Sequence, residues 1–329
     1  MFHLQSALKK YALPRPKLMS ENNDKLPLIL DIKANSLDDG PGIRSVVFFK
    51  GCPLSCVWCH NPESRKASPE IAFDTEKCID CGSCRDLCTE KALSQKNAFY
   101  VDRKACKLCF KCADSCPSAA LEMVGKPMNI DEILAKILPD KPFFDVSSGG
   151  VTLSGGEATL HMEFLSELLK SLKKNGIHSL LETCGFFDHE RFMELVYPYT
   201  DSIFFDVKIM DSMDHKKFCG LPNERILDNF RQIARTARLD GKAFLPRTPL
   251  VPDITDTEAN IKAVAAFYNE TGITEAALLS YNPLWHDKSR KMGAENPYVN
   301  NTAMTSFSDK TVMERCRRIF ENKGIKVFE

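Results

Sequence analysis

Two neighbouring stretches of the chain carry cysteines at the same spacing. The pattern C-x2-C-x2-C-x3-C occurs in CIDCGSCRDLC, residues 78–88, and again in CKLCFKCADSC, residues 106–116, which Pro117 follows. An internal repeat predicts one supersecondary unit used twice. Apolar runs are short throughout residues 66–126, so we expect this segment to be an inserted domain that bound metal holds together.

The repeat predicts two iron–sulfur clusters. Runs of this spacing followed by proline are typical of bacterial ferredoxins, in which the fourth cysteine of each run binds the other cluster. The predicted ligands of the first [4Fe–4S] cluster are Cys78, Cys81, Cys84 and Cys116. Those of the second cluster are Cys88, Cys106, Cys109 and Cys112. Zinc is the alternative, although zinc sites more often pair two C-x2-C motifs across a longer gap. Two clusters this close favour a role in electron relay.

A third cysteine group follows the apolar run VVFFK, residues 46–50, which is expected to be a buried strand. It consists of Cys52, Cys56 and Cys59. Three thiolates leave one iron of a [4Fe–4S] cluster without a protein ligand, and an open coordination position lets a metal site bind a substrate. We therefore predict that these three cysteines are the catalytic ligands and act through their cluster.

The other three of the fourteen cysteines are scattered along the chain. Cys184 and Cys219 are the candidates for a fourth ligand, which is the alternative to an open iron, and Cys316 is expected to be a buried hydrophobe. So many cysteines without a signal-peptide-like start indicate metal or redox chemistry and a cytoplasmic protein. Lys+Arg and Asp+Glu both total 44, which argues against a nucleic-acid partner, and no run is long enough to span a membrane.

Beyond the insertion, strand-like runs alternate with helical patterns. Together with VVFFK they form six strand-then-helix units, which predict a parallel sheet. Six units are too few for a closed eightfold barrel, so the expected fold is α/β, an open partial (β/α)6 barrel made of residues 28–65 and 127–329. Residues 1–27 are expected to be a loosely docked arm. The predicted helices lie near 129–138, 161–174, 188–197, 224–238, 256–270 and 308–322. The predicted strands after the insertion are GVTLS, HSLLET, SIFFDVK, KAFLPRTPLV and AALLSY.

Six further segments stand out in order from Asp38 onward. They are DDGPGIRSVVFFKGCPLSCVWCHNPE, SGGEATL, ETCGF, DVKIMD, HKKFCG and RTPLVPDITDT. Together they closely resemble the glycyl-radical-enzyme activating enzymes of the radical S-adenosylmethionine superfamily, whose larger members carry a similar doubled insertion. The resemblance implies an anaerobic oxidoreductase that cleaves S-adenosylmethionine to a 5′-deoxyadenosyl radical, which removes a hydrogen atom from a glycine of a partner glycyl radical enzyme. It also implies a low-potential electron donor such as flavodoxin or ferredoxin.

The resemblance also implies which residues contact S-adenosylmethionine. Its amino group is expected at Gly155, Gly156 and Glu157, and its ribose and carboxylate region at Glu182, Asp206 and Lys208. The other expected contacts are Arg247 to the carboxylate, Trp58 to the adenine, and Asn61. The alternatives are a plain turn at the glycines, an internal ion pair for the strand-end charges, a surface ion pair for Arg247 and core packing for Trp58.

The segment DDGPGIR is flexible by composition, and a plain turn is its simplest interpretation. The resemblance implies a loop that closes over the site when the partner's glycine enters, with Asp39 and Arg44 as contacts. Two other functions share part of the sequence pattern. A radical enzyme acting on a small metabolite would have the same cofactor motifs, and a non-enzymatic electron carrier would need only the insertion. The sequence leaves open which glycyl radical enzyme is the partner.

Overall fold

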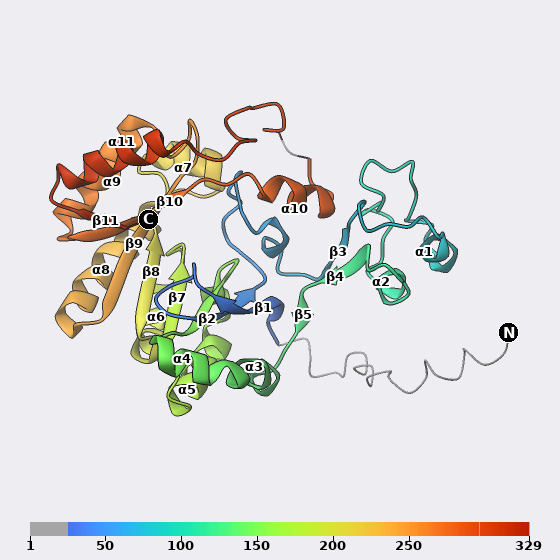
Figure 1. The fold of residues 1–329 in the computed structure, drawn as a ribbon, viewed down its shortest axis with the longest axis horizontal. Coiled ribbons are helices and arrows are strands. Elements are labelled where there is room, and N and C mark those ends of the chain that lie inside the picture. Colours follow the sequence, from blue (N-terminus) through green and yellow to red (C-terminus); the bar gives the residue numbers. More distant parts are fainter. Residues whose placement is uncertain (1–25, 296, 329) are drawn as a thin grey trace.

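The computed structural model describes residues 26–295 and 297–328, which form a large α/β body and a smaller cysteine-rich lobe (Figure 1). The lobe is the part of the chain from β3 to β4, residues 70–124. The predicted arm, residues 1–27, lies outside the described residues except for Leu26 and Pro27.

The body is built on a nine-stranded sheet in the order β11–β10–β9–β8–β7–β6–β2–β1–β5. The strands from β2 to β11 in that order run parallel, whereas β1 is antiparallel to both β2 and β5. Their bounds are β1 Leu28–Ser36, β2 Arg44–Phe49, β5 Lys126–Pro127, β6 Gly150–Gly155, β7 Ser179–Thr183, β8 Ser202–Asp206, β9 Ala243–Leu250, β10 Glu275–Ser280 and β11 Lys326–Phe328. All six predicted strands are confirmed, while β1, β5 and β11 were not predicted.

Helices follow the parallel strands, as the alternating pattern predicted. The body's helices are α3 Ile130–Ile137, α4 Lys141–Ser147, α5 Met162–Lys174, α6 His189–Leu195, α7 Ser212–Cys219, α8 Glu224–Asp240, α9 Glu258–Glu270, α10 Trp285–Lys291 and α11 Lys310–Glu321. Single 3-10 turns lie at Pro62–Ser64, Leu138–Asp140, Ala158–His161 and Tyr197–Tyr199. The six predicted helices are confirmed, and the short helices α4, α7 and α10 were missed.

Several of these helices begin at a side chain that accepts a hydrogen bond from the first turn. Asp188 accepts from the amide of Arg191 at the start of α6, and Asp211 accepts from the amide of Asp214 at the start of α7. At α3, Asn129 and Glu132 form a reciprocal capping box. Each cap satisfies an amide that has no partner within the helix, so the local sequence determines where the helix starts.

The lobe has its own two-stranded antiparallel sheet, which pairs β3 (Glu70–Phe73) with β4 (Leu121–Val124). Its short helices are α1 (Ser83–Leu87) and α2 (Lys111–Asp114). The two cysteine runs repeat the same left-handed backbone positions. These matched pairs are Asp80 with Leu108 (φ 49° and 52°), Gly82 with Phe110 (79° and 58°), and Lys91 with Ala119 (both 51°). The sequence repeat is therefore also a repeat of structure.

Lysine and arginine side chains join the lobe to the body. The Lys50 ammonium, at the end of β2, donates to Glu70 Oε2 of β3 at 2.8 Å and to the Glu63 carbonyl at 2.6 Å. Lys291 of α10 pairs with Asp74 at 3.0 Å. Lys50 is fully buried, so the position of β3 is tied to the residue that directly precedes the first cysteine loop.

Candidate active site

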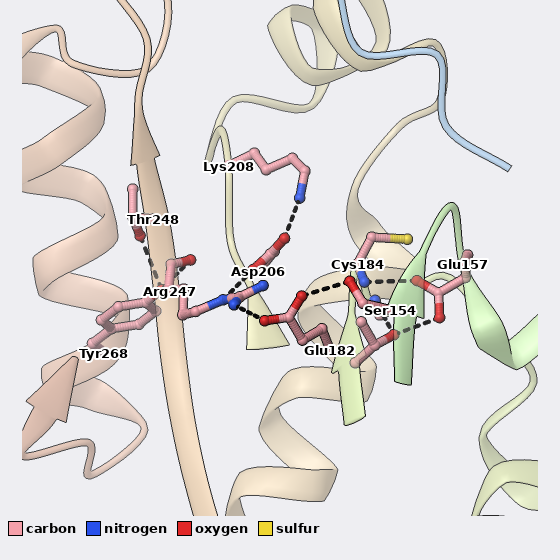
Figure 2. A network of polar contacts seen from close by, with 11 residues as sticks. Ser154, Glu157, Glu182, Cys184, Asp206, Lys208, Arg247, Thr248 and Tyr268 are labelled. Carbon is pink, nitrogen blue, oxygen red and sulfur yellow. Dashed lines mark hydrogen bonds and ion pairs between the residues drawn. The ribbon is translucent and has the colours of Figure 1, made fainter. Parts of the chain in front are cut away.

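Polar side chains from four adjacent strands of the body meet in one row (Figure 2). Ser154 of β6 donates to Glu182 of β7 at 2.6 Å. The Arg247 guanidinium of β9 donates from Nε to Asp206 of β8 at 2.9 Å and from Nη1 to Glu182. Lys208 donates to the other oxygen of Asp206 at 3.0 Å. The predicted strand-end charges therefore lie together, and among the described residues they form the internal ion pairs that the sequence left open.

This row of charges is shielded from solvent. The Arg247 and Glu182 side chains are each 12% exposed, which rules out the surface ion pair considered for Arg247. Burial alone acts to lower the pKa of Lys208, but the Asp206 carboxylate and nearby thiols outweigh it and raise that pKa above its usual range. Burial acts to raise the pKa of Asp206, but the nearby Arg247 and Lys208 cations outweigh burial and lower that pKa below its usual range. Asp206 and Lys208 are therefore both charged at neutral pH.

Glu157 is buried beside this row, at 1% exposure, and both of its carboxylate oxygens accept hydrogen bonds. Its Oε1 accepts from the hydroxyls of Thr159 at 2.7 Å and Thr183 at 2.9 Å. Its Oε2 accepts only from the amide of Cys184, at 2.7 Å. A carboxylate oxygen has two acceptor positions, so Oε2 retains capacity for one more donor.

The glycines before Glu157 bring β6 against the cysteine loop. The Gly156 amide donates to the Phe49 carbonyl and the Glu157 amide donates to the Gly51 carbonyl, both at 2.8 Å. A Cβ on Gly155 would lie 2.3 Å from the Phe49 carbonyl oxygen, and one on Gly156 would lie 2.1 Å from that of Gly51. Side chains at these two positions would separate the strands, so the glycines do more than form a turn.

Hydrogen bonds to backbone carbonyls in the last turn of α7 hold the loop of Cys52, Cys56 and Cys59. The amide of Ser55 donates to the Cys219 carbonyl at 2.8 Å, and the amide of Val57 donates to the Phe218 carbonyl at 3.0 Å. A Cβ on Gly220 would lie 2.2 Å from Ser55 Oγ. The HKKFCG segment is thus a support for the loop, a role that its sequence alone did not reveal.

Both candidate fourth cysteines lie against this loop. The Cys219 thiol contacts Cys56 and the Cys184 thiol contacts Cys52; these contacts, together with burial, raise the pKa of Cys184 and of Cys219. The same contact with Cys219 lowers the pKa of Cys56 despite its burial. Burial raises the pKa of Cys59 to about 12. Cys59 lies close enough to Cys56 and Cys52 for their charges to act on it, so the loop brings together three thiols, the ligands that an iron–sulfur cluster takes.

Most cysteines of the lobe lie near one another. One cavity is lined by all four predicted ligands of the first cluster, Cys78, Cys81, Cys84 and Cys116. Cys112 lies near Cys106 and Cys109, and burial raises its pKa to about 11. Within residues 26–295 and 297–328, no His, Cys, Asp or Glu side chains converge closely enough to hold a single metal ion, as a zinc site requires. A cubane cluster needs a wider arrangement, because each thiolate binds a different iron.

The remaining predicted residues have other contacts. Trp58 is 4% exposed and packs in the main core. Asn61 Oδ1 accepts from the Lys288 ammonium of α10 at 3.0 Å. Asp39 is partly exposed, and its carbonyl accepts from the Thr152 hydroxyl at 2.7 Å.

The prediction for Arg44 as a partner contact is wrong. Arg44 is fully buried at the start of β2, where its Nε donates to the Thr152 hydroxyl at 2.7 Å and its Nη2 donates to the Val151 carbonyl at 2.8 Å. Burial lowers its pKa to about 10. Its side chain fixes β2 against β6 and has no surface to offer a partner.

Comparisons with known proteins agree with this arrangement. A family model described as a 4Fe-4S single cluster domain matches residues 38–88. The chain is 37% identical to the isethionate sulfite-lyase activating enzyme of Nitratidesulfovibrio vulgaris, over 82% of this chain and 89% of that protein. It is 36% identical to the indoleacetate decarboxylase activating enzyme of Tractidigestivibacter scatoligenes, over 84% and 90%. The crystal structure of a radical SAM methyltransferase from Sphaerobacter thermophilus matches with a TM-score of 0.51 at 11% identity, over 92% of this chain and 76% of that one.

The fold is that of a radical SAM enzyme, an α/β body with a mostly parallel sheet. Within that class, the chain belongs to the glycyl-radical-enzyme activating enzymes. It is an enzyme that activates a partner glycyl radical enzyme through radical SAM chemistry. No helix in the described part of the chain is long and apolar enough to cross a membrane.

Proposed function

We propose that Cys52, Cys56 and Cys59 hold the catalytic [4Fe–4S] cluster and leave one iron open for S-adenosylmethionine. The observation that carries this proposal is the position of the cysteine loop. It is bonded through Gly51 to Glu157, and the charged row begins beside it. In this proposal Cys184 and Cys219 are not a fourth ligand; they come from other segments of the chain and support the loop through the contacts of their thiols with Cys52 and Cys56.

The charged row and Glu157 offer a binding group to each polar part of S-adenosylmethionine. Lys208 and Arg247 offer cations to its carboxylate, Glu182 and Asp206 offer acceptors to its hydroxyl groups, and Glu157 Oε2 has capacity for its ammonium group. We place the amino group also at Gly155 and Gly156, and the adenine near Trp58 and Asn61. The bound ligand and cluster together supply the 5′-deoxyadenosyl radical that takes a hydrogen atom from the partner's glycine.

We further propose that the chain has three [4Fe–4S] clusters. The insertion, residues 66–126, then holds one cluster at Cys78, Cys81, Cys84 and Cys116 and another at Cys88, Cys106, Cys109 and Cys112. The four-cysteine cavity and the repeated backbone support this assignment. The insertion receives electrons from a low-potential donor such as flavodoxin or ferredoxin, and the cysteine-rich composition favours the reducing cytoplasm as the location.

We also propose that the body is an open partial (β/α)6 barrel made of residues 28–65 and 127–329. The support is the run of parallel strands, whose edge strands β11 and β5 do not pair with each other. In this arrangement the carboxyl ends of β2, β6, β7, β8 and β9 surround the cysteine loop. The first residues, 1–27, are proposed as a separate arm.

The partner is best found by direct test. Relatives named for a sulfite-lyase, a decarboxylase and a hydroxyproline dehydratase are 33% to 37% identical to this chain, so identity does not select among them. The anaerobically reconstituted chain is mixed with each corresponding glycyl radical enzyme, S-adenosylmethionine and a chemical reductant. One enzyme should gain a glycyl radical signal by electron paramagnetic resonance, and Cys56→Ala should abolish it. Cleavage of S-adenosylmethionine without a radical on any partner would favour the small-metabolite alternative. About twelve irons per chain are expected, and four irons with bound zinc would contradict the three-cluster proposal.

A further inference from the structure

The two halves of the lobe share a backbone but carry opposite charge. Residues 74–86 contain four acidic and two basic side chains, whereas the matched residues 102–114 contain two acidic and four basic ones. The same left-handed positions recur in both halves, so the fold does not demand this difference. The opposite net charge of the two halves therefore needs an explanation other than folding.

The basic residues of the first half are neutralised within the molecule. Lys77 pairs with Glu122 at 3.1 Å, and Arg85 pairs with Asp80 at 3.0 Å. An exposed ion pair presents little net charge to an approaching protein. The first half therefore offers a partner mainly its unpaired acidic side chains.

Three lysines of the second half are left unpaired. Lys104, Lys107 and Lys111, the lysine patch, are exposed and make no side-chain hydrogen bond or ion pair with any described residue. The fourth cation, Arg103, is turned inward and donates to the Ile71 carbonyl at 2.9 Å. Asp102 is occupied locally, because its carboxylate accepts from the amides of Lys104 and Ala105. The patch is thus a concentration of free positive charge.

The lysine patch flanks a surface cysteine in the sequence, since Lys107 and Lys111 each lie two residues from Cys109. Cys109 is exposed, and its neighbour Leu108 is 37% exposed. Cys81 is the matched residue in the first half and is also exposed, but the neighbouring Asp80 is paired with Arg85. Both halves therefore bring one thiol to the surface, and only the second half has unpaired lysines close to that thiol in the sequence.

We propose that the lysine patch docks an acidic electron-carrier protein such as a flavodoxin. The carrier loses one electron, and the iron–sulfur centre that includes Cys109 gains it. This inference rests on the proposed function, since it requires a cluster in the second half of the lobe. The patch lies on the lobe, which stands to one side of the sheet of the body, so a carrier bound there docks away from strands β6 to β9, which carry the charged row (Figure 1). Complementary charge increases association rates about 10- to 1,000-fold and makes binding sensitive to salt.

The test compares two triple variants with equal change in net charge. The first is Lys104→Glu, Lys107→Glu and Lys111→Glu. The control is Lys33→Glu, Lys310→Glu and Lys323→Glu, three exposed body lysines that also make no side-chain bond to any described residue. Binding of an acidic flavodoxin to each holoenzyme is measured by surface plasmon resonance at low and high ionic strength. Reduction of the clusters by that flavodoxin is measured by stopped flow.

We expect the patch variant to bind the flavodoxin about tenfold more weakly at low ionic strength, with little remaining salt dependence, while the control binds like the wild type. With a chemical reductant, both variants should generate the glycyl radical at the wild-type rate. Equal weakening in both variants would overturn the proposal, because net charge would then explain the effect. Weaker binding of the glycyl radical enzyme to the patch variant, with flavodoxin unaffected, would also overturn it. Failure of the proposed function is a separate result, seen as missing iron in the wild-type lobe.

Discussion

The body and the lobe are ordered by different means. The body has an extensive apolar core in which strand residues such as Leu153 and Leu181 are completely buried against helix residues such as Leu168. The lobe core has six buried residues, and one of them, Cys112, is a proposed metal ligand. Burial of so few apolar side chains offsets little of the entropy lost by the lobe. We therefore expect the proposed clusters to supply the lobe's stability, whereas the body folds by hydrophobic packing.

The largest expected effect is loss of structure in the lobe while the body stays folded. Changing Cys106→Ala together with Cys109→Ala should prevent assembly of the second lobe cluster and disorder that half of the lobe, since metal binding and folding are coupled there. The body should remain folded and should still bind S-adenosylmethionine. Both tryptophans, Trp58 and Trp285, are buried in the body, so their fluorescence reports its unfolding alone.

Limited proteolysis and tryptophan-detected unfolding together check this prediction. Trypsin should cut the lobe of the double variant and leave the body intact, with an unchanged unfolding midpoint. Cys316→Ala, a change in the body core, is the control that should leave the lobe resistant. A lobe that stayed resistant without its two thiolates would show that the clusters do not stabilise it.

The next effect concerns the bond that joins the two regions. Lys50→Met leaves Glu70 partly buried with only the exposed Lys66 as its ion-pair partner. We therefore expect the free energy of unfolding to decrease by about 3–5 kcal/mol. Lys50→Met combined with Glu70→Met should recover much of that loss, because no buried charge remains unpaired. Lys141→Met in the exposed Lys141–Asp145 pair should cost about 0.5 kcal/mol or less. Urea unfolding measures all three, and equal losses for the two single variants would contradict the buried-pair argument.

The same contrast explains how much of the fold the sequence could predict. Strands covered on both faces appear as continuous apolar runs, such as SLLET in β7, and all six such strands were found. In β1 the exposed Asp31 and Lys33 interrupt the apolar residues, and β11 has only three residues, so neither produced a recognisable run. In the lobe, where apolar runs are short, the structural repeat was predicted from the cysteine spacing and not from apolar periodicity.

The site was only partly predictable for a related reason. A charged residue at the end of an apolar strand is visible in the sequence, which revealed Glu182, Asp206 and Arg247. Their pairing depends on strand register, in which Asp206 lies opposite Arg247, and register cannot be read from one strand alone. Arg44 was misassigned because its partners, Thr152 and the Val151 carbonyl, come from a strand more than a hundred residues away.

A smaller effect contrasts two left-handed glycines, one from each region. Gly185 of the body has φ +78°, and a Cβ there would lie 2.0 Å from the Phe205 ring. Gly82 of the lobe has φ +79°, and its Cβ would meet nothing closer than 3.4 Å. Gly185→Ala should therefore lower the free energy of unfolding by about 2–4 kcal/mol, through backbone strain and overpacking. Gly82→Ala should lower it by about 1–2 kcal/mol, through backbone strain alone.

Thermal unfolding of the two alanine variants measures the difference. Phe110 already occupies the left-handed conformation at the position matched to Gly82, so the lobe tolerates a side chain there. Equal losses at the two glycines would mean that packing around Gly185 relaxes more easily than its contact with Phe205 indicates.

The smallest expected effect is a pH dependence confined to the body. Residues 66–126 contain no histidine, whereas the body has a half-buried His178 and a buried His215. Burial, together with the nearby Arg44 guanidinium, lowers the pKa of His178, which also contacts Ser202 at 3.1 Å and lies near Asp201. Burial likewise lowers the pKa of His215, although its ring contacts the Leu221 carbonyl at 2.6 Å, with Lys208 and Glu224 nearby.

The sign of this dependence follows from proton binding. Above the unfolded histidine pKa of about 6.5, both states are neutral and the stabilisation is complete. As pH falls below that value, the unfolded chain binds protons that the folded body does not, so the body's free energy of unfolding should decrease. Urea unfolding followed by tryptophan fluorescence between about pH 7.5 and 5.5 measures the slope. His178→Gln should reduce that slope, because the neutral amide does not titrate, whereas replacing the exposed Lys96 of the lobe by Gln should leave it unchanged. A slope that His178→Gln does not alter would mean that the folded body accepts the proton on His178 as readily as the unfolded chain does.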